Sequence, residues 1–126
     1  MTGEHLDANL LIHLCGAGDW KDAQRTGEIR PDSLATVGFV HLSAPWQVHL
    51  PANRLFAGRA DLAALYIDPT ALHAPLRWEP GVPGDPDSML FPHLYGPVPV
   101  RAVVDCRSYR PGPDGRFPAV IHRPIR

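Results

Sequence analysis

Three histidines lie in short apolar segments that are typical of β-strands. His13 is in the segment LLIHLC, His41 in VGFVHLS and His93 in LFPHLYG. An imidazole titrates near neutral pH and can donate a hydrogen bond, accept one or bind a metal, so an apolar strand has little structural reason to carry one. Three such strands indicate one shared site, and we expect the three rings to converge on one cleft.

Neighbouring side chains could complete this site. Because side chains alternate across a strand, the residues two positions from His41 and from His93 share a face with each ring. These predicted substrate-binding residues are Phe39, Ser43, Phe91 and Tyr95. Asn53 and Arg54 could contact a phosphate group, although exposed arginines at helix ends are usually solvated. Trp20, Trp46 and Phe56 are expected in the hydrophobic core.

The spacing of the histidines does not favour a metal site. Three histidines could hold a catalytic zinc with water in the fourth position, but no pair here is closely spaced, as in H-x-H or H-x-x-x-H. We therefore predict a metal-free site in which one imidazole acts as acid or base and the other polar groups hold the ligand. For any single histidine, a hydrogen bond to a neighbouring backbone group is the alternative.

Glu79 is a candidate carboxylate for the same site. It stands between Trp78 and Pro80, an apolar setting that would raise the pKa of a buried carboxyl group. It could act as a general base or bind a ribose hydroxyl. A solvated strand end, or an ion pair with Arg77, would explain it equally well.

Length and charge restrict the class of protein. The 126 residues form one expected domain, 1–126, which is long enough for its own core. With 12 basic and 13 acidic side chains the formal net charge is −1, which gives no basic surface overall for nucleic acid or an anionic membrane. The polar first residues are unlike a signal, and no segment approaches the roughly 20 apolar residues of a membrane span. We expect a cytoplasmic protein with reduced Cys15 and Cys106.

The apolar segments and the turn residues predict an α+β domain. We expect strands at 9–15, 37–42, 60–67, 76–79, 90–96, 98–109 and 117–121. A helix is expected over 18–27 and another from Pro45, which Pro51 should break because proline inside a helix costs about 3 kcal/mol. Pro51 is then expected to begin a second short helix that ends at Gly58. Residues 31–34 read as a turn, 80–87 as an irregular loop, and 106–126 as a C-terminal hairpin and tail. Strands and helices do not alternate regularly, which favours α+β over α/β.

These motifs resemble the DUF952 family of small bacterial proteins. The resemblance covers about residues 10–105 and is carried by a strand histidine, a D-W-x-x-A helix, the motifs S-L, G-F-x-H-x-S, A-N-R and F-P-H-x-Y-G-P, a glutamine and an acidic residue. The matching residues are His13, Asp19, Trp20, Ala23, Ser33, Leu34, Gly38, Phe39, His41, Ser43, Gln47, Ala52, Asn53, Arg54, Glu79, and 91–97. Pro51 stands where the family more often has an aliphatic residue.

The DUF952 family looks related to the ADP-ribosyltransferase fold, which implies two small, mostly antiparallel sheets around a cleft that holds NAD, with two or three short helices. By that resemblance His13 would bind a ribose of NAD, and His41 and Ser43 would face the nicotinamide. His93 would occupy the position where many transferases have a catalytic glutamate. A neutral histidine stabilises an oxocarbenium-like centre less well, so Glu79 would have to supply the carboxylate from within the cleft.

The sequence thus predicts a small enzyme that acts on NAD or a nucleotide-like molecule by ribosyl transfer or hydrolysis. The alternatives are a metal-free acid/base enzyme, such as a lyase, dehydratase or cyclase acting on a specialised metabolite, and a non-catalytic ligand-binding module. The predicted catalytic residues are His93, His41, His13 and Glu79. No metal and no cofactor is predicted, NAD being a possible substrate, and the expected partner is a small molecule rather than nucleic acid or membrane.

Overall fold

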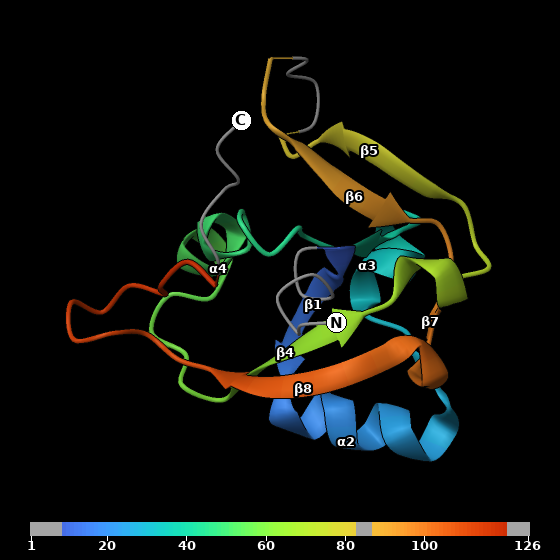
Figure 1. Ribbon diagram of the computed structural model, residues 1–126, viewed down its shortest axis with the longest axis horizontal. Coiled ribbons are helices and arrows are strands. Elements are labelled where there is room, and N and C mark those ends of the chain that lie inside the picture. Colours follow the sequence, from blue (N-terminus) through green and yellow to red (C-terminus); the bar gives the residue numbers. More distant parts are fainter. Residues whose placement is uncertain (1–8, 83–86, 121–126) are drawn as a thin grey trace.

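The computed structural model describes residues 9–82 and 87–120, which form three small antiparallel sheets with short helices between them (Figure 1). The first sheet has the order β1–β4–β8, with bounds Leu11–Gly16, Leu62–Ile67 and Val103–Tyr109. The second has the order β3–β6–β5, with bounds Val40–His41, Leu90–Leu94 and Leu76–Pro80. Strand β2 (Glu28–Ile29) pairs with β7 (Val98–Pro99). The predicted α+β class is confirmed, but the described chain has three sheets where two were expected.

Strand β4 is the centre of the first sheet and separates two hydrophobic cores. All of its residues are buried, because β1 and β8 flank it on both edges. Its side chains alternate, so Leu65 and Ile67 belong to one core and Ala64 and Tyr66 to the other. On β1, His13 shares the face of Leu11, which is the face that packs against helix α2.

Helix α2 (Ala17–Thr26) follows β1 directly and ends at Gly27, as the sequence predicts. Gly27 adopts a φ of 90°, and its N–H donates to the carbonyl of Ala23. This left-handed conformation favours glycine because it has no Cβ. Ala23 is buried, and Trp20 packs against the first core. Ala23 and Trp20 therefore fix the helix against this core.

Helix α4 (His49–Leu55) contradicts the predicted break at Pro51. Residues 45–48 form turns, so the helix begins later than expected, and Pro51 falls in its first turn. The N–H groups of a first turn have no acceptor within the helix, so the missing N–H of proline removes no hydrogen bond there. The predicted break failed because the first helix was expected to start four residues too early, whereas the short helix expected from Pro51 to Gly58 is present in part, as the remainder of α4.

Other elements also differ from their predicted form. Residues 32–36 form the short helix α3 (Asp32–Thr36) where a turn was expected, and the expected strand 37–42 is reduced to β3. The expected strand 98–109 is divided by the 3₁₀ turn η2 (Val100–Ala102). A further 3₁₀ turn, η1 (Pro69–Ala71), follows β4. No strand forms within 110–120, so the C-terminal hairpin is wrong as far as the described residues extend; residues 83–86 of the expected loop lie outside them.

The first and second sheets are tied together beside the histidines. Ile12 and Ser43 form an antiparallel bridge in which the N–H of Ile12 lies 2.7 Å from the carbonyl of Ser43, and the N–H of Ser43 lies 2.8 Å from that of Ile12. On the second sheet, His41 is paired directly with His93. These pairings bring the three histidine-bearing strands to one region. No helix of the described residues is long and apolar enough to cross a membrane.

Candidate functional site

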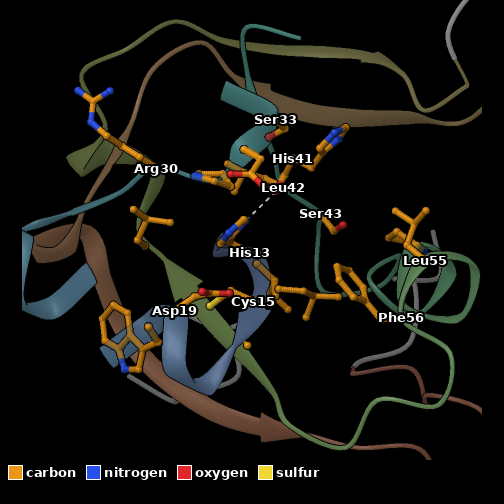
Figure 2. Close-up of a pocket in the computed structure, with 18 of the residues that line it drawn as sticks. His13, Cys15, Asp19, Arg30, Ser33, His41, Leu42, Ser43, Leu55 and Phe56 are labelled. Atoms are coloured by element: carbon orange, nitrogen blue, oxygen red, sulfur yellow. Dashed lines mark hydrogen bonds between the residues drawn. The ribbon is translucent and has the colours of Figure 1, made fainter. Parts of the chain in front are cut away.

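A pocket of about 680 Å³ lies at the junction of the first and second sheets (Figure 2). Its lining comes from β1, α2, the segment 28–33, the segment 41–43, α4 and β6. Most small-molecule sites have volumes between about 300 and 1,000 Å³, so the pocket is large enough for a metabolite. His13, His41 and His93 all line it. The structure thus brings together the three rings that the sequence predicts to share a cleft.

His13 is buried and presents a neutral ring to this pocket. Its Nδ1 lies 3.0 Å from the carbonyl oxygen of His41, as the dashed line in Figure 2 shows. A carbonyl oxygen only accepts, so Nδ1 carries the proton and Nε2 keeps its lone pair. Burial lowers the pKa of His13, which keeps the ring neutral. No described residue bonds Nε2, which is therefore available to accept a hydrogen bond or a proton from a ligand.

His93 is held by Glu79 in a similar way. Register places Glu79 of β5 opposite Phe91, on the face that carries His93. The Nδ1 of His93 lies 2.8 Å from Oε1 of Glu79, and the hydroxyl of Tyr95 donates to the same oxygen at 2.6 Å. The buried His93 ring is therefore oriented with Nε2 unbonded by any described residue. A carboxylate behind an imidazole fixes its tautomer and supports a positive charge on the ring.

Glu79 does not have the environment that its neighbours in sequence suggest. Hydrogen bonds from Tyr95 and then from His93 lower the pKa of Glu79, whereas the apolar neighbours predicted a raised pKa. The side chain of Glu79 is 32% exposed, so desolvation is weaker than these hydrogen bonds. Neither Glu79 nor Tyr95 lines the pocket. Glu79 is therefore an ionised group that contacts His93 from behind rather than a carboxylate that faces a ligand.

Aromatic contacts fix the remaining rings. Phe39 stacks on His93 with ring centroids 3.9 Å apart and an angle of 16° between the planes. His41 meets Phe39 edge-on at 4.9 Å and His93 at 5.5 Å. Partial burial lowers the pKa of His41, and electrostatic interactions with His93, His13 and Arg54 lower it further. Phe39 thus positions two histidines without lining the pocket itself.

The other predicted ligand contacts divide into two groups. Phe91, Arg54 and Ser43 line the pocket; Ser43 is buried, and Figure 2 shows it beside His41 with no described partner for its hydroxyl. Asn53 does not line it. The amide of Asn53 donates to the carbonyl of Phe117 at 3.2 Å and accepts from the N–H of Phe117 at 2.7 Å. Asn53 therefore holds the C-terminal segment and is not placed to bind a ligand in this pocket.

Sequence reasoning missed several residues of the pocket wall. Trp20 and Phe56 pack against the two cores, as expected, but they also line the pocket, as do Asp19 and Cys15. The position of Asp19 and Trp20 one turn after a histidine strand was the available signal. Burial and then the charge of Asp19 raise the pKa of Cys15 to about 12, so its thiol is protonated at neutral pH and is a poor nucleophile. Within residues 9–82 and 87–120, no three His, Cys, Asp or Glu side chains are grouped closely enough to hold a metal ion.

Comparison with known proteins identifies relatives of this chain. The family model for DUF952, described as a protein of unknown function, matches residues 14–106. The crystal structure of protein CC0527 from Caulobacter crescentus is 30% identical, with a TM-score of 0.72 over 86% of this chain and 93% of that chain. Its solution NMR structure is 28% identical, with a TM-score of 0.71 over 86% and 90%. A comparison with curated proteins finds no match.

Proposed function

This chain belongs to the DUF952 family, and we propose that it is a small-molecule enzyme in which His93 acts as general acid and base. The observation that carries the proposal is the bond between Glu79 and Nδ1 of His93, at 2.8 Å, which directs the unbonded Nε2 of a pocket-lining ring away from the carboxylate. When Nε2 takes a proton, the carboxylate stabilises the imidazolium that forms. A purely structural histidine would not need an oriented, unbonded nitrogen beside a cavity of this size.

His13 gives the proposed site a second, differently tuned nitrogen. Its Nε2 lone pair can accept a hydrogen bond from a hydroxyl or N–H of the substrate, and the hydroxyl of Ser43 can donate one. A reaction that removes a proton at one atom and returns one at another suits such a pair. We therefore favour a metal-free lyase, dehydratase or cyclase among the reaction classes.

Ribosyl transfer or hydrolysis on NAD or a similar nucleotide is the second candidate. In its favour, two three-stranded antiparallel sheets flank a pocket large enough for a nucleotide, as in the ADP-ribosyltransferase-like fold that the sequence resembles. It ranks second because Glu79 bonds His93 and Tyr95 and does not line the pocket. Release of nicotinamide from NAD by the wild-type protein would promote this candidate.

A comparison of variants tests the proposal without a known substrate. The wild-type protein, His93→Ala and the control His73→Ala, whose ring lies outside the pocket, would each be incubated with a cell metabolite extract and followed by mass spectrometry. We expect at least one metabolite to be consumed by the wild type and the control, and His93→Ala to be slower by about 10²–10⁴-fold. His41→Ala is expected to raise the substrate concentration needed more than it slows turnover.

The fold of each variant must be measured in parallel. We expect His93→Ala to keep its circular dichroism spectrum and to lose little melting temperature. If it loses several kcal/mol of stability and still converts the metabolite at the wild-type rate, His93 is a core residue and the proposal is wrong. If no metabolite changes but one binds, the protein is a ligand-binding module.

A further inference from the structure

We propose that Arg54, together with an apolar groove beside it, forms a subsite for an anionic substrate that carries a short hydrocarbon arm. The inference rests on the proposed function in taking the main pocket as the substrate site. It adds the chemical class of the substrate: one phosphate or carboxylate group, and a linear or aryl arm of a few carbon atoms.

Arg54 differs from the other arginines of the pocket. Arg30 is paired with Glu28 at 2.9 Å, and Arg59 with Asp61 at 2.6 Å. Arg54 lines the same pocket, and within the described part of the chain it has no acidic partner. A guanidinium group carries its charge at every physiological pH and binds phosphate or carboxylate through two parallel N–H groups. Among the arginines that line the pocket, Arg54 can thus bind an anion without breaking an ion pair with a described residue.

The groove beside Arg54 has a volume of about 240 Å³ and is mostly apolar. It lies between α4 and the described ends of β5 and β6. Arg54, Pro51, Gly81 and Phe91 line both this groove and the main pocket, so the two spaces meet at these residues. The remaining wall includes Leu50, Val82 and Met89, which are 42%, 45% and 41% exposed. Exposed apolar side chains gathered at the mouth of a pocket are typical of a ligand contact.

Described hydrogen bonds fix the shape of this groove. The N–H of Gly81 donates to the carbonyl of Met89 at 2.9 Å, and the N–H of Val82 donates to the hydroxyl of Ser88 at 3.2 Å. At Gly81 a Cβ atom would lie 2.7 Å from a ring carbon of Phe91. The absence of a side chain at Gly81 therefore lets the ring of Phe91 lie across the boundary between the two spaces.

Arg54 also links the groove to the histidines. Arg54 and His41 both line the main pocket, and the positive charge of Arg54 is among the causes that lower the pKa of His41. An anion held by Arg54 would sit near His41, and its hydrocarbon arm would extend over Phe91 toward Met89. The reactive part of the substrate would then occupy the main pocket beside His93.

A binding experiment with simple probes tests this arrangement. The sequence contains only two methionines, so protein with ¹³C-labelled methionine methyl groups gives two signals, and Met89→Leu assigns that of Met89. Hexyl phosphate would be compared with inorganic phosphate, which lacks the arm, and with hexanol, which lacks the charge. The variants are Arg54→Gln and, as a matched control, Arg59→Gln, because Arg59 lines the same pocket but is already paired.

We expect hexyl phosphate to shift the Met89 signal saturably, and inorganic phosphate to leave it unchanged. Loss of one charge-assisted hydrogen bond predicts that Arg54→Gln raises Kd about tenfold or more, whereas Arg59→Gln changes it less than twofold. Hexanol is expected to bind at least tenfold more weakly than hexyl phosphate. Equal effects of the two arginine variants, or binding of phosphate as tight as that of hexyl phosphate, would overturn the inference, the latter indicating an adventitious ion only.

His93→Ala separates this inference from the proposed function. It should bind hexyl phosphate with the wild-type Kd, since it removes neither Arg54 nor the groove. Binding that depends on Arg54, in a protein that converts no metabolite, would refute the enzyme proposal and leave the subsite. Turnover that depends on His93, with no effect of Arg54→Gln on binding, would refute the subsite and leave the enzyme proposal.

Discussion

Replacing His13 by asparagine should make the stability of the protein less sensitive to acid. Because burial lowers the pKa of His13 below its ordinary value of 6.5, the unfolded chain takes up a proton near that pH before the folded one does. The free energy of unfolding then increases with pH in this range, since the unfolded state binds more protons. His13 thus stabilises the fold fully above about pH 7.5 and less as the pH falls below 6.5.

The size of the effect follows from the unfolded-state pKa. A histidine that stays neutral in the folded protein, with an unfolded pKa near 6.5, sets the upper limit: it lowers the free energy of unfolding by up to about 1.4 kcal/mol between pH 7.5 and 5.5. With a urea m-value of about 1–3 kcal/mol/M, the urea midpoint moves by about 0.5–1.4 M. The range ends above the ordinary pKa of 4.5 for a glutamate, so protonation of Glu79 contributes little.

Asparagine is the matched substitution because its side-chain N–H₂ can replace Nδ1 as donor to the carbonyl of His41, and it does not titrate. Urea unfolding at pH 7.5, 6.5 and 5.5 would be followed for the wild type, His13→Asn and His73→Asn. We expect His13→Asn to be less stable at pH 7.5 because the smaller side chain leaves a cavity, but to lose less stability on acidification, by up to about 1.4 kcal/mol. His73→Asn is the control for the loss of one imidazole outside the pocket. An unchanged pH dependence in His13→Asn would refute the neutral ring, and with it the free lone pair on Nε2.

Three further predictions address single side chains. Glu79→Gln should slow the His93-dependent conversion by about 10–100-fold, by analogy with oriented metal-ligand histidines, and should shift the Nδ1 resonance of His93; an unchanged rate would contradict the positioning role. Cys15, with its pKa raised to about 12, should react with iodoacetamide at pH 8 at least tenfold more slowly in the folded than in the urea-unfolded protein, as measured by mass spectrometry. Asn53→Ala should cost about 1–3 kcal/mol of stability, seen in the melting temperature, because the buried backbone of Phe117 loses its partners; a change under 0.5 kcal/mol would speak against this clamp.

Local signals were sufficient for the elements whose cause is local. Short apolar segments predicted β1 and β4, and Gly27 predicted the end of α2, because a left-handed residue at that position is a property of the glycine itself. The predicted break at Pro51 was wrong because the effect of a proline is not local. Its effect depends on whether it lies in the first turn or the interior of a helix, and the start of α4 is set by the turns before it.

The candidate site shows the same division. The presence of imidazoles in apolar strands is visible in the sequence, and so is the motif F-P-H-x-Y-G-P that contains His93 and Tyr95. Which oxygen accepts the Nδ1 proton of His93 is decided by the register of β5 against β6. The pKa of Glu79 is likewise lower than its apolar neighbours suggest, because His93 of β6 and Tyr95, which directly follows β6, bond it.

The sequence by itself therefore determined the family, the α+β class and the histidines that line the pocket. Only the tertiary structure decided that Glu79 contacts His93 from outside the pocket, that Asn53 holds Phe117, and that Arg54 is unpaired among the described residues. The physical reason is the range of the interactions. Strand and turn preferences depend on neighbours a few residues apart, whereas hydrogen bonds, ion pairs and cavity walls depend on which distant segments pack together.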